Sequence, residues 1–363
     1  MSACRKLKSS LKAARWADRS FECSPARKEI STLKEHNTSK AERRLNGRTK
    51  EAVIGYLFAA PAIIGFLLLT LYPMLASLFY SFNNITTAHG VTTFQWVGLQ
   101  NYQNILKDPV IGVDFRKSLS VTLLYAAVNV VLVILFCLVC ALLLNRKFRG
   151  RNLLRGLYFL PSVIPMVATG IVWKMLLQNQ AQGGLVNWFF LKVMKMHPID
   201  FINSPAIFIT LFLMSLWTCG GTTVVLIAAL QDVPKDQLES IEIDGGNAWH
   251  KFAKVTLPTI KPILFFQMIM CMMTSIQIYT QSVVFSRNGA PDHLTYFINI
   301  MIYDHAFVQN NMRGQAAAEA WVVFVIILVI TLALFSAEGV FRKDDSSGSA
   351  RAKKRAKREA GRK

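Results

Sequence analysis

Long apolar stretches without charge alternate with shorter polar stretches along this chain. Runs free of Asp, Glu, Lys and Arg cover residues 52–106, 118–145, 156–173, 201–231, 262–286 and 320–337. A helix needs roughly 20 mostly apolar residues to cross the hydrocarbon core of a bilayer. The pattern therefore predicts an all-α polytopic membrane protein with six transmembrane helices, approximately at 53–82, 119–144, 157–177, 205–230, 263–286 and 320–341.

The third of these spans has the most interrupted pattern. Pro161, Pro165 and Gly170 lie within it, and Lys174 lies near its end. Membrane helices tolerate Pro and Gly where neighbouring groups satisfy the freed backbone hydrogen bonds. We therefore expect a spanning helix here as well.

Composition and charge placement agree with a membrane protein and orient it. The chain is 53% hydrophobic, with a mean hydropathy of +0.35. The two tails and the loops 145–156 and 231–262 hold 33 Lys and Arg, whereas the loops on the other side hold 7. Basic residues mark the cytoplasmic side. We expect both termini and the 231–262 loop in the cytoplasm, and the first apolar run to be retained as an anchor because it is too long for a cleaved signal.

The two basic tails flank a single membrane domain. Residues 1–52 and 343–363 are polar and basic, a composition typical of disordered segments, and residues 53–342 form the predicted six-helix domain. The net charge of +20 is compatible with nucleic-acid binding. Because no nucleic-acid motif accompanies it, attraction to anionic lipid is the favoured interpretation and no nucleic-acid partner is expected. Cys137 and Cys140 lie in an apolar helix and are interpreted as buried thiols.

Turn and cap residues organise the loops. On the outer side, Gly98 indicates a turn and Asn101 is a candidate cap for a short helix through Leu106. On the inner side, Gly150 and Gly156 are expected to break the chain before the third span.

The polar loop at 231–262 carries a pattern of its own. Pro234 suits the first turn of a helix, and Gly245 with Gly246 provides a left-handed stop. Asn247 is a candidate cap for a second helix from Ala248 to about Thr256, which Pro258 is expected to end. The pattern predicts a helix–turn–helix at the inner membrane face.

Both predicted helices of this loop are amphipathic. Leu238 and Ile241 share one face of the first, and Trp249, Phe252 and Val255 share one face of the second. Such a face can enter a groove on a partner protein. The pattern by itself is equally compatible with a face that packs on the protein's own helices.

The same stretch resembles the EAA loop of ABC-importer permeases, which reads Glu-Ala-Ala, three residues, Gly, nine residues, Ile-x-Leu-Pro. The residues at those positions are Glu239, Ser240, Ile241, Gly245, Val255, Leu257 and Pro258. Ser240 and Ile241 depart from the two alanines. The run VPKDQLESIEIDGGNAWHKFAKVTLPTIKP is similar to the carbohydrate-importer version of this loop.

The resemblance extends over about residues 53–342. It includes YLFAAPAIIGFLLLTLYPMLASLFYSF, WVGLQNY, LLLNRKFRGRNLLRGLYFLPSVIP and LIAALQDVP. Together these segments resemble sugar permeases of the kind that includes the MalF and UgpA subunits.

The resemblance implies a type I ABC-importer permease fold and a division of labour. Two homologous permeases form the translocation path in the bacterial inner membrane, two ATP-binding subunits use ATP and Mg, and an extracellular binding protein delivers the sugar. This chain would bind no cofactor and hydrolyse nothing, in keeping with its lack of a Gly-Lys pair for a phosphate loop. The EAA loop would be the coupling helix to the ATPase, through Glu239, Asp244, Gly245, Trp249, Phe252, Leu257 and Pro258.

Polar side chains within the apolar helices are the candidates for contact with the solute, because they are costly there unless they line a cavity or pair with neighbours. The candidates are Gln277, Tyr279 and Gln281 in the fifth span, Asn129 in the second, and Trp217, Thr218, Thr222 and Thr223 in the fourth. Interhelical hydrogen bonding is the alternative role for each.

Two other functions make different demands on the sequence. An intramembrane enzyme needs HExxH or facing aspartates, and the chain has no HExxH and no aspartate within the six spans. No catalytic or metal-binding residue is therefore expected. A permease of the same fold for a non-sugar solute is the alternative, because few residues decide the substrate.

Overall fold

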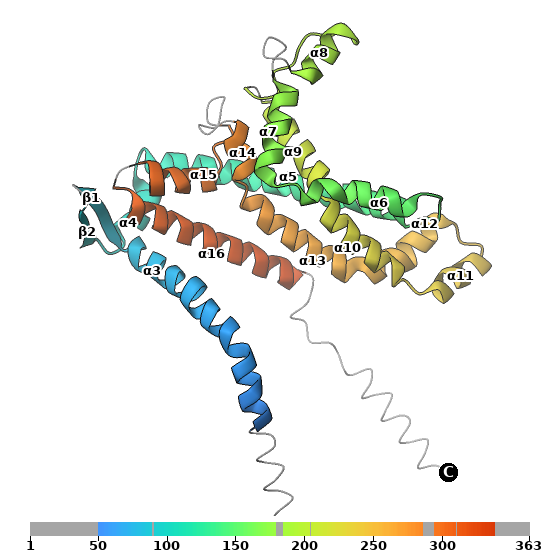
Figure 1. Ribbon diagram of the computed structural model, residues 1–363, viewed down its shortest axis with the longest axis horizontal. Helices are drawn as coiled ribbons and strands as arrows, with labels where there is room; N and C mark the ends of the chain where they lie inside the picture. The colour runs from blue at the N-terminus through green and yellow to red at the C-terminus, as the bar shows by residue number, and fades with distance from the viewer. Residues whose placement is uncertain are drawn as a thin grey trace, which may run out of the picture. The chain divides into compact units, whose positions relative to one another are not determined.

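The computed structural model describes residues 50–88, 91–178, 184–203, 205–285, 294–309 and 311–337 (Figure 1). Almost all of the two basic tails therefore lies outside the described residues. The chain divides into two compact units, residues Met1–Ala76 and Ser77–Lys363. The first unit contains a helix that begins at residue 50 and has a π-helical turn, η1 (Leu67–Leu71), before Pro73. A π turn of this kind lets a helix continue past a proline, which has no backbone N–H to donate.

The described residues of the second unit form helices, loops and one hairpin. It begins with the end of α3 (Tyr72–Ser81) and the antiparallel strands β1 (Asn83–Ala88) and β2 (Val91–Trp96), in which Asn83 pairs with Trp96. The following helices are α4 (Gln100–Lys107), α5 (Ile111–Asn145), α6 (Arg151–Phe159), η2 (Leu160–Val163), α7 (Met166–Leu177), α8 (Leu185–Lys192), α9 (Ile207–Thr218) and α10 (Gly220–Gln231). The rest are α11 (Lys235–Ile243), α12 (Ala248–Lys251), η4 (Phe252–Thr256), α13 (Leu257–Ile276), α14 (Thr280–Phe285), α15 (Ile298–Tyr303), η5 (Asp304–Val308) and α16 (Arg313–Ala337).

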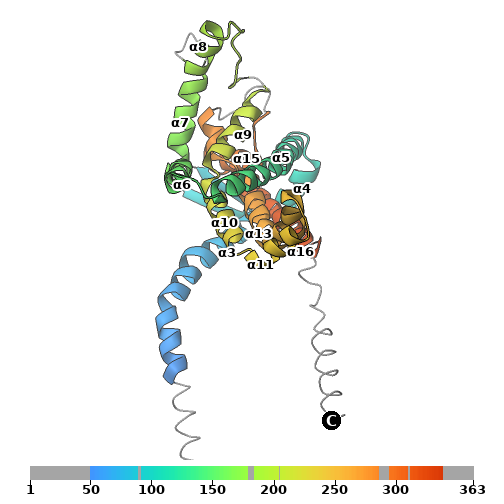
Figure 2. The ribbon, with the colours of Figure 1, turned by 90° about the vertical axis from the view of Figure 1, so that its right-hand side faces the viewer.

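Helix α5 is the axis of this second unit. At 35 residues it contributes to three successive core clusters: Phe115 to one with α15 and α16, Tyr125 to one with α9, and Cys137 to one with α10 and α13. Figures 1 and 2 show α13 alongside α5, and the two helices are in contact. The 35 residues extend over about 50 Å at 1.5 Å per residue, so this helix ties both ends of the unit together.

The number of membrane spans depends on how bent helices are counted. Among the described residues, four helices are long and apolar enough to cross a bilayer, and six spans result if each of two bent pairs is one span. The segment Arg151–Val163 meets Met166–Leu177 at 96°, and Ile207–Thr218 meets Gly220–Gln231 at 47°. The third and fourth predicted spans are therefore not straight helices.

Proline causes the sharper of these bends. Ile164 is extended and precedes Pro165, which caps α7. A residue before proline is driven out of the helical region by the proline ring. In the fourth span the helix breaks at Cys219, where Gly220 lies so close to the third span that a Cβ would stand 2.9 Å from the Tyr158 carbonyl oxygen.

Two predicted boundaries, at Pro258 and Gly156, were wrong, and two helices begin before the spans that were predicted from hydropathy. Helix α5 begins at Ile111 and α16 at Arg313, well before the predicted starts of the second and sixth spans. Pro258 does not end a helix: the helix that starts at Ala248 runs through η4 into α13, with Pro258 in the first turn of α13. The π turn directly before α13 changes the hydrogen-bond register of the helix, so that the backbone N–H that Pro258 lacks is not needed. Gly156 lies within α6, whereas Gly150, with φ of 84°, does precede that helix as predicted.

The predicted outer helix is present but its cap is different. Gly98 has a left-handed φ of 58°, and α4 follows. Leu99 is the N-cap, and Asn101 is buried within the helix. The Asn101 amide donates hydrogen bonds to the carbonyl oxygens of Ser81 and Asn83, at 2.9 and 3.1 Å. Its role is to hold the hairpin, which local sequence does not reveal.

Candidate functional site

A polar cavity of about 250 Å³ lies where the broken helices meet α5. The break at Cys219 and the end of α13 at Ile276 both open onto it. The lining residues are Tyr125, Asn129, Val133, Met166, Ser215, Thr218, Cys219, Thr222, Gln267, Met270, Cys271, Thr274, Ser275, Ile278 and Gln281. Amides, hydroxyls, thiols and apolar groups are present, and no lining residue carries a formal charge at neutral pH. This chemistry suits an uncharged, hydroxyl-rich solute.

Asn129 and Ser275 form the deepest polar pair of the cavity wall. Both are about 5% exposed, and the Asn129 Nδ2 donates to Ser275 Oγ at 2.9 Å. The Asn129 Oδ1 is buried and accepts no hydrogen bond from any described residue. A buried amide oxygen without a donor is unfavourable by about 1–3 kcal/mol. The site therefore contains an acceptor whose hydrogen-bonding capacity is unused.

Tyr125 is held rigidly at the same wall. Its hydroxyl lies 3.1 Å from Ser215 Oγ, and its ring stacks on Phe212 with centroids 5.1 Å apart. Phe297 packs edge-on against the same ring. These contacts fix the direction in which the phenol faces.

Only some of the predicted solute-contact residues lie at this cavity. Asn129, Thr218, Gln281 and also Thr222 line it. Thr223 does not, because it is buried beside Tyr158 with its hydroxyl 3.4 Å from that phenol oxygen.

The other predicted residues lie elsewhere. Gln277 is exposed and caps the end of α13, and Tyr279 packs against the ring of Tyr303 at 5.3 Å. Trp217 lies edge-on to Trp173, where both border a separate apolar cavity of about 360 Å³.

Several lining residues were not predicted, although they share one face of a helix. Gln267, Cys271 and Thr274 of α13 follow one another at spacings of four and three residues. This spacing places them on one face of α13. Polar members along one stripe of an otherwise apolar helix were the available signal.

The predicted cytoplasmic loop folds as two limbs around a glycine turn. Gly245 has a left-handed φ of 77°, and Asn247 caps α12 by accepting from the backbone N–H of His250 at 3.0 Å. Both features follow the sequence analysis. Across the turn, Lys251 Nζ lies 2.6 Å from Glu242 Oε2. This ion pair lowers the pKa of the exposed Glu242 carboxyl from its ordinary value of 4.5.

The apolar residues of the loop divide between the protein core and the surface. Leu238, Ile241 and Val255 pack on the cluster formed with α5, α10 and α13. Ile243 and Trp249 are 86% and 69% exposed. The loop thus rests on its own helices along one side and presents apolar side chains on another.

The two departures from the alanine pair have different surroundings. Ser240 is exposed, whereas the Ile241 side chain reaches the core cluster and contacts Gly246. A Cβ at Gly246 would also stand 2.9 Å from the Ile241 carbonyl oxygen. The larger residue at 241 is therefore accommodated by the second glycine of the turn.

The remaining residues predicted for coupling are mostly at the surface. Glu239 and Asp244 are exposed, Leu257 and Pro258 are exposed in the first turn of α13, and Phe252 is half-buried against Trp249 at 5.7 Å.

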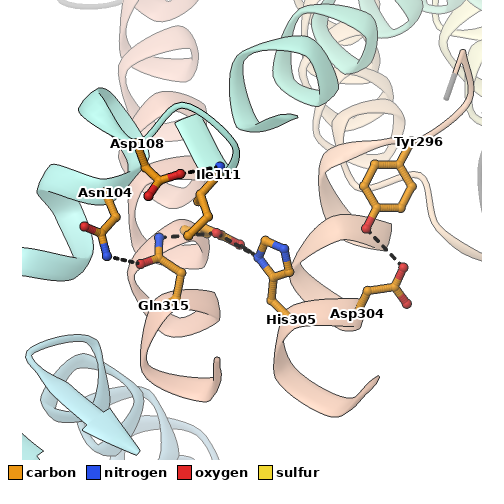
Figure 3. A network of polar contacts seen from close by, with 8 residues as sticks. Asn104, Asp108, Ile111, Tyr296, Asp304, His305 and Gln315 are labelled. Atoms are coloured by element: carbon orange, nitrogen blue, oxygen red, sulfur yellow. Dashed lines mark hydrogen bonds and ion pairs between the residues drawn. The ribbon is translucent and has the colours of Figure 1, made fainter. Parts of the chain in front are cut away.

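A buried polar network, which local sequence does not reveal, links α4, η5 and α16 (Figure 3). Nδ1 of His305 lies 2.9 Å from both carboxylate oxygens of Glu319. Gln315 donates to Glu319 at 3.3 Å and accepts from Asn104 at 3.3 Å.

A second contact lies beside this network. The hydroxyl of Tyr296 donates to Asp304 Oδ2 at 3.1 Å (Figure 3). Burial and the nearby carboxylate of Asp304 raise the pKa of Tyr296 well above 10. Together these contacts hold the segment before α16 onto α16 and α4.

The described cysteines are free thiols. Cys137 is buried, and its Sγ donates to the carbonyl oxygen of Cys219 at 3.5 Å. Within the described residues, no three His, Cys, Asp or Glu side chains form a group suited to a metal ion.

The long apolar helices, the uncharged polar cavity between broken helices and the two-limbed polar loop are together typical of a multi-pass membrane transport component. Residues 133–343 match the binding-protein-dependent transport system inner membrane component family, and the chain belongs to it. It is a transport component of the plasma membrane.

The alignments with curated relatives cover nearly the whole length of those relatives. The chain is 33% identical over 302 residues to the probable ABC transporter permease protein YesP of Bacillus subtilis, covering 82% of this chain and 94% of that protein. It is 27% identical over 297 residues to the trehalose/maltose transport system permease protein MalF of Thermococcus litoralis, covering 81% and 96%.

The fold also matches a solved transporter. A chain from the crystal structure of a bacterial ABC transporter that imports the acidic polysaccharide alginate aligns with a TM-score of 0.66 at 19% identity, over 81% of this chain and 98% of that one. At this identity the likeness concerns the fold.

Proposed function

We propose that this chain is one permease subunit of an ATP-driven carbohydrate importer and that the polar cavity is its part of the solute path. The observation that carries the proposal is the cavity lining: amides, hydroxyls and Tyr125 surround it without any formally charged group. Hydroxyl-rich neutral solutes exchange hydrogen bonds with such groups. The relatives named as permeases for trehalose and maltose or for arabinooligosaccharides support the same solute class.

The cytoplasmic loop is proposed as the coupling element to an ATPase subunit. Exposed Trp249 and Ile243 supply an apolar contact, and exposed Glu239 supplies a charge for a basic partner. The loop leads without interruption from α12 through η4 into α13. A movement of α11 and α12 is therefore transmitted to α13, which carries Gln267, Thr274 and Ser275 of the cavity.

The assembly is proposed to contain a second homologous permease, two ATP-binding subunits and an extracellular solute-binding protein. The family description, which specifies binding-protein-dependent transport, supports the last of these. Both termini and the coupling loop face the cytoplasm in this proposal, in a six-span topology that counts each bent pair once.

The test is reconstitution of this chain with the second permease, the two ATP-binding subunits and the solute-binding protein in proteoliposomes. ATP is enclosed in the vesicle lumen, which corresponds to the cytoplasm. We offer three kinds of labelled solute in parallel: neutral oligosaccharides, their uronic-acid counterparts and amino acids. We expect ATP-dependent uptake of a neutral saccharide that depends on the binding protein. Uptake of an amino acid with no saccharide uptake overturns the carbohydrate assignment and leaves the permease assignment intact.

A further inference from the structure

Lys174 places a cation within the apolar third span, near the end of α7. An ionisable side chain at this position is costly unless a specific partner compensates it. Its Nζ donates to the carbonyl oxygen of Val284 at 2.8 Å and to that of Phe285 at 3.2 Å. Both acceptors belong to the last residues of α14.

These carbonyl groups are suited to hold an ammonium group. The last four carbonyl groups of a helix lack partners within the helix, and they form its negative end. Within the described residues α14 covers Thr280–Phe285, and the carbonyl oxygens of Val284 and Phe285 at its end accept the hydrogen bonds from the Lys174 ammonium group. The interaction thus compensates the cation and completes the helix end in one contact.

Close packing accompanies the charge contact. Gly170 lies one turn before Lys174 on α7, and a Cβ there would stand 3.2 Å from both Cβ and Cγ1 of Val284. The absence of a side chain at Gly170 allows α14 to approach the α7 backbone. Figures 1 and 2 both show α14 beside α7, and the two helices are in contact.

Helix α14 also carries Gln281, which lines the polar cavity, whereas Lys174 does not line it. We propose that Lys174 is a positioning residue that joins α7 and α14 into one rigid body and thereby sets the place of Gln281 in the solute path. The inference rests on the proposed function only in treating the polar cavity as part of the solute path. The joining of the two helices stands independently of the solute.

The first arm of the test needs no solute. A Gly170→Cys/Val284→Cys pair is oxidised in the assembled transporter, with each single variant as a control for the native thiols. The two Cβ atoms would start 3.2 Å apart, so the helices must separate by a few tenths of an ångström to reach the usual Cβ–Cβ distance of a disulfide. We expect rapid cross-linking with Lys174 or Lys174→Arg and a rate lower by on the order of tenfold with Lys174→Met, because two charge-assisted hydrogen bonds are lost. Equal rates in all three backgrounds overturn the proposed join.

The second arm measures transport. Lys174→Met is expected to raise the apparent KM for solute about tenfold, and Lys174→Arg to stay near the wild-type value. Oxidation of the cysteine pair in the Lys174→Met background is expected to restore the KM, since a covalent link replaces the cationic one. A KM that stays raised after cross-linking overturns the positioning role in favour of direct solute contact.

A third measurement covers the case in which Lys174→Met does not assemble. The cysteine pair in the wild-type Lys174 background is then cross-linked during transport. Unchanged uptake agrees with a rigid body, and a loss that a reductant reverses overturns it. If the wild-type transporter imports no saccharide at all, the proposed function fails, while the cross-linking rates still decide the join between α7 and α14.

Discussion

His305 and Glu319 form a buried pair in which one ring nitrogen lies 2.9 Å from both carboxylate oxygens. The pair joins η5 to the start of α16, and Glu319 has no exposed surface. Gln315 and Asn104 extend the contact to α4. The N-terminal end of α16 is thus held by polar groups in addition to apolar packing.

Removing one partner of this pair is expected to be strongly destabilising. For Glu319→Ala we expect a loss of about 3–5 kcal/mol in unfolding free energy, because the donors of His305 and Gln315 remain buried without an acceptor. Thermal unfolding of the purified protein in detergent measures this. Gln103→Ala, at an exposed position of α4, is the control and should change little. A Glu319→Ala variant as stable as this control would contradict the role of the pair.

Gly245 is expected to be essential for the shape of the proposed coupling loop. Its φ of 77° costs a residue with a side chain about 1–2 kcal/mol, and more for a β-branched one. Gly245→Val should insert into the membrane normally and lose most saccharide-stimulated ATP hydrolysis in the reconstituted complex. Gly55→Ala, where no atom lies within 4 Å of the added Cβ, should keep full activity. Wild-type stimulation in Gly245→Val refutes the coupling assignment.

Acid is expected to loosen the loop locally. The pKa of Glu242 is lowered in the folded protein by Lys251, so the ion pair stabilises the loop above the ordinary carboxyl pKa of 4.5. That contribution is lost as the pH falls through the lowered folded pKa. Hydrogen exchange of residues 235–251, corrected for intrinsic rates, should therefore rise below about pH 4. Glu242→Gln should remove this pH dependence and Glu239→Gln should keep it; equal profiles for both variants would contradict the ion pair's role.

Substitution of Asn129 is expected to weaken transport without lowering the stability of the fold. In Asn129→Leu the unsatisfied Oδ1 disappears, so the unfolding temperature in the absence of solute should stay equal or rise. The apparent KM for saccharide should nevertheless rise about tenfold if that oxygen accepts a solute hydroxyl. Gln277→Ala serves as the control, because Gln277 is exposed outside the cavity. A destabilised Asn129→Leu with an unchanged KM would show that the amide serves packing alone.

The candidate site was only partly predictable because its wall is assembled by helix breaks. Gln281, Thr218 and Asn129 stand out as polar residues in apolar runs, and all three line the cavity. Gln277 has the same sequence signature, but α13 ends one residue before it, and the residue is exposed. The register of each polar residue relative to the break decides which face it occupies, and no local pattern specifies the position of the break.

Local chemistry alone determined the membrane class, the Gly245 turn and the Asn247 cap, because hydropathy, left-handed φ and capping each depend on a few neighbouring residues. Tertiary structure alone decided that the helix continues past Pro258 and that Asn101 binds the hairpin backbone. It also decided the pairing of His305 with Glu319 and the contact of Lys174 with the end of α14. Each of these depends on a partner supplied by a distant segment or on a π turn that the surrounding helices support. Proline and buried polar groups acquire their roles from such partners, which sequence neighbours do not provide.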